Sequence, residues 1–231
     1  MLNLREYAQL SLLVYNHNAA ICIDQAFPGV FDDVLEYEVG HLKAVCCVDA
    51  RNQQGYVVFK GFEWYPGSLF KMLSFKPGQK QIHPALLKDF EMIYEHLSEA
   101  LYSMREECTE IHACGHSWGG ALAAVLATTE TLGSVTTFGQ PRIGSSDNVW
   151  RSMRCHTYTR VVNAGDLLCE VPFGFGYGHH GAEILMSSNP DHSFENANVI
   201  RRWVEHGIAL LKASFAQYHR MSRYLERMKS L

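Results

Sequence analysis

The sequence has no run of 18 apolar residues, so no segment predicts a membrane-spanning helix. It also lacks internal repeats, low-complexity tracts and linkers, which favours one domain over residues 1–231. The formal net charge is −4, and this small acidic excess argues against a protein built mainly to bind nucleic acid. With 47% hydrophobic and 12% aromatic residues, the chain is apolar enough to fold around a sizeable core.

The seven cysteines include no Cys-x-x-Cys pair. Their number is odd, Cys46 and Cys47 are adjacent, and most of them lie in apolar, strand-like runs. This pattern predicts buried thiols and not a disulfide framework. The first residues, Met1 to Tyr7, carry charges where a signal peptide needs an apolar block. We therefore expect a cytoplasmic protein, or one exported without a cleaved signal peptide.

Charge is distributed unevenly along the chain. Residues 201–231 hold seven Lys or Arg and two Glu, which gives +5, whereas the first 200 residues carry a net charge of −9. This basic tail indicates either a helix with a solvated basic face or a peripheral contact with an anionic membrane surface.

Short strand-like runs alternate with helical segments. Helices are predicted over 2–15, 84–104 and 118–129, and along the tail from residue 194, where apolar residues recur every three or four positions. Strands are predicted over 34–39, 44–48, 56–59, 111–114, 135–138, 156–162 and 183–186. The alternation predicts an α/β fold with a mostly parallel central sheet and helices on both faces. Ligands in such sheets bind beyond the carboxyl ends of the strands.

The segment Gly115-His116-Ser117-Trp118-Gly119 contains the pattern G-x-S-x-G. It lies between an apolar strand-like run and a helix of small apolar residues, which is the strand–turn–helix context of a nucleophile elbow. A strained backbone at such a turn lifts the serine Oγ above the sheet. Only glycine fits at 115 and 119, because strand and helix nearly collide there. A phosphate-binding loop is disfavoured, because the chain has no G-x-x-x-x-G-K-[ST] pattern.

A serine nucleophile needs a base that takes its proton and an acid that orients the base. If the acid and the base both lie after Ser117 in the chain, the favoured acid is Asp166. It lies in a Gly-containing turn just after the strand-like run 160–162. Asp147 lies in a polar turn and is interpreted as a helix cap, and Glu170 and Glu183 remain alternatives.

The base is predicted to be His192, which lies in the loop after the last predicted strand and before the tail helix. His179 and His180, in the preceding glycine-rich loop, remain alternatives. His206 and His219 are assigned to the interior of the tail helix, and therefore to a structural role.

Together these segments resemble the class 3 lipases, the fungal-lipase-like α/β-hydrolases. The matching segments occur in family order over roughly residues 55–197, at 57–61, 82–84, 115–121, 138–144, 160–163 with Asp166, 177–183 and 192–193. The resemblance implies that Ser117 is the nucleophile, Asp166 the acid and His192 the base. It implies an oxyanion hole formed by the backbone N–H groups of Trp118 and Phe62. Where the family has Thr or Ser after Gly61, this chain has Phe62, so a hydroxyl donor is missing.

By the same resemblance, residues 62–81 form a lid-like insertion, and residues 194–231 form a basic C-terminal helical region. The implied function is a serine carboxylic-ester hydrolase that cleaves a lipid ester, either a glyceride or a phospholipid, through an acyl-enzyme. No metal or organic cofactor is implied. Three alternatives remain: acyl transfer at the same site, a phospholipase-type effector targeted to membranes, and a catalytically impaired binding module shaped like a hydrolase.

Overall fold

The computed structural model describes residues 1–62, 82–172, 177–189 and 192–228. The predicted lid over 62–81 therefore lies outside the described residues, apart from Phe62. None of the helices in the described ranges combines the length and the apolar character needed to cross a membrane.

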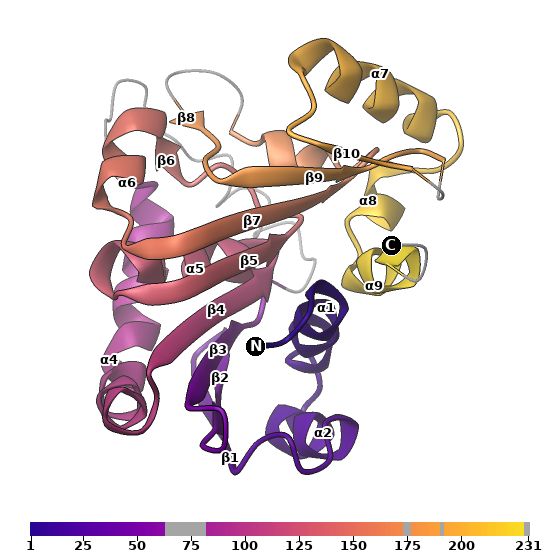
Figure 1. The fold of residues 1–231 in the computed structure, drawn as a ribbon. Helices are drawn as coiled ribbons and strands as arrows, with labels where there is room; N and C mark the ends of the chain where they lie inside the picture. Colours follow the sequence, from indigo (N-terminus) through magenta and orange to yellow (C-terminus); the bar gives the residue numbers. More distant parts are fainter. Residues whose placement is uncertain (63–81, 173–176, 190–191, 229–231) are drawn as a thin grey trace.

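Eight strands in the described chain form one sheet in the order β1-β2-β3-β4-β5-β7-β9-β10 (Figure 1). Their bounds are β1 Asp33–Val39, β2 Leu42–Asp49, β3 Gln54–Phe59, β4 Glu110–His116, β5 Leu132–Phe138, β7 Cys155–Asn163, β9 Ala182–Met186 and β10 Ser193–Glu195. The strands from β3 to β9 are parallel, and antiparallel pairs occur at both edges, β1 with β2, β2 with β3 and β9 with β10. The prediction of a mostly parallel sheet is confirmed. A short second sheet pairs β6 (Gly144–Ser145) with β8 (Tyr177–Gly178).

Helices cover both faces of the sheet, as predicted (Figure 1). On one face lie α1 (Leu4–Leu13), α2 (Ala19–Ala26) and α9 (Met221–Arg227), and on the other lie α4 (Pro84–Glu107), α5 (Trp118–Thr129) and α6 (Ser146–Ser152). These six helices pack apolar side chains against the sheet, and the two faces form separate cores.

α5 is the central helix of its face, and it follows β4 after the single residue Ser117. Every residue from Trp118 to Ala127 is buried, which fits a helix that is apolar all round. Small residues allow this close contact, because a Cβ on Gly120 would lie 2.9 Å from the carbonyl oxygen of Gly115 and 3.2 Å from Cβ of Thr137.

The tail does not form one long helix. After β10 the chain forms α7 (Val199–Leu210), α8 (Phe215–Tyr218) and α9, and the apolar face predicted for the tail is exposed on α7. The tail breaks because its last helix folds back onto the sheet, where Tyr224 is fully buried and packs edge-on against Phe138. Residues 219 and 220 lie at the break between α8 and α9.

The seven cysteines are free thiols, and five of them are buried. Cys22 and Cys155 are half-buried. The prediction of thiols instead of disulfides is confirmed.

Candidate active site

Ser117 occupies a strained turn between β4 and α5. Its backbone has φ 57° and ψ −125°, a region that non-glycine residues rarely adopt. A Cβ on Gly115 would lie 2.5 Å from the carbonyl carbon of Gly119, and a Cβ on Gly119 would lie 2.2 Å from the carbonyl oxygen of Phe59. Both positions therefore require glycine, as the sequence pattern predicts, and the turn presents Ser117 at the carboxyl end of β4.

Three buried side chains meet at this turn. The Nε2 atom of His219 lies 2.7 Å from the Oγ atom of Ser117, and its Nδ1 atom lies 2.9 Å from both carboxylate oxygens of Asp166. A carboxylate only accepts hydrogen bonds, so Nδ1 carries the proton and Nε2 is free to accept from the serine hydroxyl. The arrangement is that of a nucleophile, a base and an orienting acid.

The prediction of His192 as the base is wrong in this geometry. His192 is exposed in the loop between β9 and β10, where its Nδ1 lies 2.8 Å from Nδ2 of Asn189. His192 directly precedes β10, the strand at the edge of the sheet, whereas the return of α9 over the sheet brings His219 to Ser117. This position of His219 was hard to predict, because no Gly or Pro marks the break at 219–220 and the apolar spacing continues through it.

Asp166 follows the end of β7 in a turn that depends on Gly165, whose φ is +92°. Its carboxylate accepts hydrogen bonds from the Tyr224 hydroxyl at 2.6 Å and from the backbone N–H of Leu168 at 3.2 Å. Burial acts to raise the pKa of Asp166, but the pairing with His219 and the hydrogen bonds from His219 and Tyr224 outweigh it. The pKa of Asp166 therefore lies below its ordinary value, and the group is ionised at neutral pH.

The alternative acids and base have other partners. Glu170 and Glu183 both bind Arg202, with N–O distances of 3.2 and 2.6 Å. The Nε2 atom of His179 lies 2.6 Å from the carbonyl oxygen of Cys169. Glu170 and Glu183 belong to a buried polar network beside β7 and β9.

His116 lies behind the nucleophile and holds the main chain of His219. Its Nε2 lies 2.6 Å from the carbonyl oxygen of His219, and its Nδ1 lies 2.8 Å from the Tyr15 hydroxyl. A carbonyl oxygen accepts only, so Nε2 carries the proton and Nδ1 accepts from Tyr15. Burial, reinforced by an electrostatic effect of the neighbouring His219, lowers the pKa of His116 to about 3, so the His116 ring is neutral. The sequence did not indicate this contact.

The two residues predicted to line an oxyanion hole flank Ser117. Trp118 begins α5, and the first N–H groups of a helix have no acceptor within it. A Cβ on Gly61 would lie 3.2 Å from Cβ of Ser117, so the chain leading into Phe62 passes against the nucleophile. The rings of Phe62 and Trp118 stack with centroids 5.0 Å apart, and the Trp118 indole donates to Asp89 at 3.0 Å. Their role as donors to an oxyanion stays a prediction.

A cavity of about 280 Å³ lies beside His219. Its lining is mostly apolar and comes from α1 and the residues just after it, the segment after β3, the end of β4, and the break between α8 and α9 with the start of α9: Leu12, Tyr15, Phe62, His116, His219, Arg220, Met221 and Ser222. Arg220 is exposed and adds a cation to this apolar wall. The cavity can therefore take an apolar chain next to the histidine.

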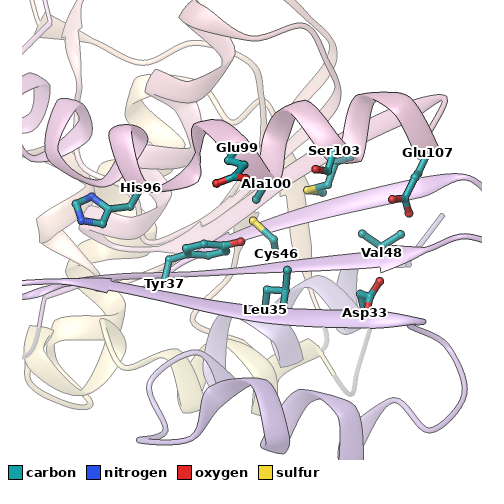
Figure 2. Close-up of a pocket in the computed structure, with 11 residues that line it drawn as sticks. Asp33, Leu35, Tyr37, Cys46, Val48, His96, Glu99, Ala100, Ser103 and Glu107 are labelled. Carbon is teal, nitrogen blue, oxygen red and sulfur yellow. The ribbon is translucent and has the colours of Figure 1, made fainter.

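A second cavity of about 270 Å³ lies between α4 and the strands β1 and β2 (Figure 2). Figure 2 shows Glu99 and Glu107 reaching from α4 toward these strands, and Cys46 below them. Burial raises the pKa of Cys46 to about 12, so its thiol is protonated and is not an activated nucleophile. Across the described part of the chain, no group of three or more His, Cys, Asp or Glu side chains is arranged to hold a metal ion.

Comparisons with known proteins identify a family and similar solved structures. The family model for class 3 lipases matches residues 56–175, just over half of the chain. The lipase of Rhizopus microsporus var. chinensis superposes with a TM-score of 0.72 at 17% identity, covering 93% of this chain and 84% of that chain. The Lip2 lipase of Yarrowia lipolytica gives 0.65 at 19% identity, covering 80% and 78%. A triacylglycerol lipase whose catalytic centre is a serine protease triad gives 0.67 at 19% identity, covering 94% of each chain. A search of curated proteins gave no match.

The matched segment, residues 56–175, begins in β3 and includes the turn at Ser117 and Asp166. The similar structures have the α/β-hydrolase fold, and the order of strands with helices on both faces agrees with it. The chain therefore belongs to the class 3 lipase family and is a carboxylic-ester hydrolase of the lipase type.

Proposed function

We propose that this protein hydrolyses lipid esters through a triad of Ser117, His219 and Asp166. The observation that supports the proposal most strongly is the hydrogen-bonded path from the Ser117 Oγ through the imidazole to the Asp166 carboxylate, with steps of 2.7 and 2.9 Å. A base within this distance of a hydroxyl can take its proton as the hydroxyl attacks.

In the first step the Oγ atom of Ser117 attacks the ester carbonyl carbon while its proton moves to Nε2 of His219. The imidazolium that forms is stabilised by the ionised Asp166, which keeps the Nδ1 proton on the ring. The tetrahedral oxyanion would accept hydrogen bonds from the backbone N–H groups of Trp118 and Phe62. Removing one such donor typically costs about 3 kcal/mol of transition-state stabilisation.

In the second step the Nε2 proton of His219 passes to the leaving alcohol, and the carbon–oxygen bond to that alcohol breaks. The acyl group is then bonded to the Oγ of Ser117. A water molecule gives one proton to Nε2 and attacks the acyl carbon, which releases the carboxylic acid and restores the serine hydroxyl.

The lining of the cavity beside His219 favours a lipid ester over a small polar one. Leu12, Phe62 and Met221 offer apolar contact for an acyl chain, since apolar burial stabilises binding in proportion to area. Arg220 offers a cation to a phosphate or carboxylate near the ester. We propose a glyceride or a phospholipid as the substrate, reached by peripheral contact with an anionic membrane.

The proposal is tested by incubating the protein with mixed micelles of triacylglycerol, phosphatidylcholine and phosphatidylglycerol, and measuring released fatty acid and lysolipid by mass spectrometry. Ser117→Ala is the control, and hydrolysis of a short p-nitrophenyl ester is measured in parallel. We expect lipid hydrolysis by the unmodified protein and a loss of about 10⁴-fold or more in the control. Equal release by both proteins would contradict the proposal.

A further inference from the structure

The outer face of α7 is apolar and exposed to solvent. Ile200 is 78% exposed and Leu211, directly after the helix, is 89% exposed. Trp203, Val204 and Ile208 on the same face are each about half exposed or a little less. These positions recur every three or four residues, so they form one continuous stripe, which we call the α7 stripe. Gly207 extends it, since nothing lies within 4 Å of the place where its Cβ would be.

The inner face of the same helix is polar and is paired with residues of neighbouring elements. Arg202 binds the carboxylates of Glu170 and Glu183. Glu205 accepts one hydrogen bond from the Ser187 hydroxyl and one from the Ser188 hydroxyl. A surface helix of a globular protein ordinarily turns its apolar stripe inward and its charges outward. α7 has the opposite orientation, and large exposed apolar patches of this kind mark interaction surfaces.

α7 also sits on the two segments that hold the triad. The backbone N–H of Gly165, next to Asp166, donates to Nδ1 of His206 at 2.9 Å. The Tyr218 hydroxyl, next to His219, donates to the carbonyl oxygen of Ala209 at 3.1 Å. Figure 1 shows α7 near the end of the sheet where α8 and α9 lie. The stripe is therefore at the same end of the molecule as Ser117.

The charges around the stripe are those that suit an anionic surface. Residues 199–212 contain three cations, Arg201, Arg202 and Lys212, and one acid, Glu205, which is buried. Arg201 and Lys212 are exposed at the border of the stripe. Arg201 also lies over the Phe194 ring and 3.8 Å from Glu205, and Lys212 donates a hydrogen bond to a backbone carbonyl. The border is thus cationic, while the body of the chain is acidic, with −9 over the first 200 residues.

We propose that the α7 stripe is a docking face for an anionic phospholipid surface. The stripe would lie in the plane of the interface with Trp203 and its aliphatic neighbours among the acyl chains, and Arg201 and Lys212 would meet the phosphates. The α7 stripe lies on a single convex helix with a cationic border, and this shape and charge suit a fluid, negatively charged lipid surface. The inference rests on the proposed function for its choice of a lipid partner, because docking here would bring the triad's end of the molecule to the lipid.

The test uses vesicles of diether phospholipids, which contain no carboxylic ester and so cannot be hydrolysed. The full chain is sedimented with vesicles of diether phosphatidylcholine containing about 30% diether phosphatidylglycerol, and with vesicles of diether phosphatidylcholine alone. We expect binding to the anionic vesicles that weakens as salt is raised. The double variant Ile200→Ser, Leu211→Ser should bind at least about tenfold more weakly, because two apolar side chains leave the interface.

The matched control is Ile21→Ser, which changes a side chain that is 57% exposed on α2. It should bind like the unmodified protein, and all variants should hydrolyse a soluble p-nitrophenyl ester at unchanged rates. Equal vesicle binding by the double variant and the unmodified protein would overturn the inference, as would no binding at all.

Two other outcomes are distinguishable. If the stripe instead contacts a second copy of this chain, sedimentation velocity will show a concentration-dependent dimer that the double variant loses, and the lipid assignment fails. If the unmodified protein binds anionic vesicles through the stripe but hydrolyses no ester, the proposed function fails while the docking face stands.

Discussion

Replacing Tyr224 with phenylalanine tests how the fold holds Asp166, the acid of the proposed triad. Phenylalanine keeps the ring that packs against Phe138 and removes only the hydroxyl. That hydroxyl donates to Asp166 at 2.6 Å and accepts from the backbone N–H of Asn163 at 3.1 Å. Both partners are completely buried, so water cannot replace the lost hydroxyl.

The size of the effect follows from these two contacts. A buried hydrogen bond to a charged group contributes about 1.5–3 kcal/mol, and a buried N–H left without an acceptor costs about 1–3 kcal/mol. The two effects share one atom and are not strictly additive, so we expect the free energy of unfolding to fall by about 3–5 kcal/mol.

The measurement is urea unfolding of the unmodified protein and Tyr224→Phe at pH 7 and at pH 3. The pKa of Asp166 is depressed in the folded state, so its contribution to stability is present above the unfolded pKa of about 3.9 and is lost as pH falls through the folded value. Tyr224 supplies part of that depression. The difference between the two proteins should therefore narrow below about pH 4.

Tyr102→Phe is the matched control, since it removes a hydroxyl from a side chain that is 63% exposed on α4. It should change the free energy of unfolding by less than about 0.5 kcal/mol. If Tyr224→Phe behaves like this control, or if its effect is the same at both pH values, the assigned support of Asp166 is refuted.

Three further predictions concern the elbow, the histidine behind it and the cavity. Gly119→Ala should destabilise the protein by about 3 kcal/mol or more, because the new methyl group meets the backbone of Phe59 and Lys60. Its control, Gly207→Ala on the open surface of a helix, should be neutral or stabilising. Similar melting temperatures for the two variants would contradict the assigned close contact at Gly119. His116 is neutral in the folded protein, whereas in the unfolded chain its side chain takes up a proton below about pH 6.5. The free energy of unfolding should therefore fall between about pH 6.5 and pH 3 by up to about 1.4 kcal/mol per pH unit. His116→Gln should make this fall shallower, and an unchanged slope would count against a neutral His116. Arg220→Gln should lower kcat/KM for phosphatidylglycerol by about tenfold more than for triacylglycerol. Equal losses for the two substrates would show that the Arg220 cation does not select the substrate.

The parts of the site that depend on local geometry could be predicted from the sequence. The turn at Ser117 is dictated by a steric conflict between adjacent elements, and only a pattern with glycine at 115 and 119 resolves it. Asp166 could be predicted in the same way, because it follows a strand of the sheet within a few residues. The α/β alternation also predicted the parallel sheet, since buried strands and amphipathic helices have distinct periodicities.

The base depends on how the tail packs, which the local pattern does not encode. His219 lies between two helices that the apolar spacing joins into one, and the chain breaks there because α9 gains burial for Tyr224 and Met221 on the sheet. The orientation of α7 could not be predicted from the sequence for a related reason. Periodicity identifies an apolar face but does not say whether that face meets the core or the solvent, and the charged inner face is held by partners far away in the sequence.

The central claim is that His219, and not His192, activates Ser117. The most direct test is the rate at which a fluorophosphonate labels Ser117, followed by intact-protein mass spectrometry with Ser117→Ala as the blank. His192→Ala should be labelled at the rate of the unmodified protein, and His219→Ala at least about 10³-fold more slowly, because the serine loses the acceptor of its proton. Fast labelling of His219→Ala together with slow labelling of His192→Ala would contradict the account.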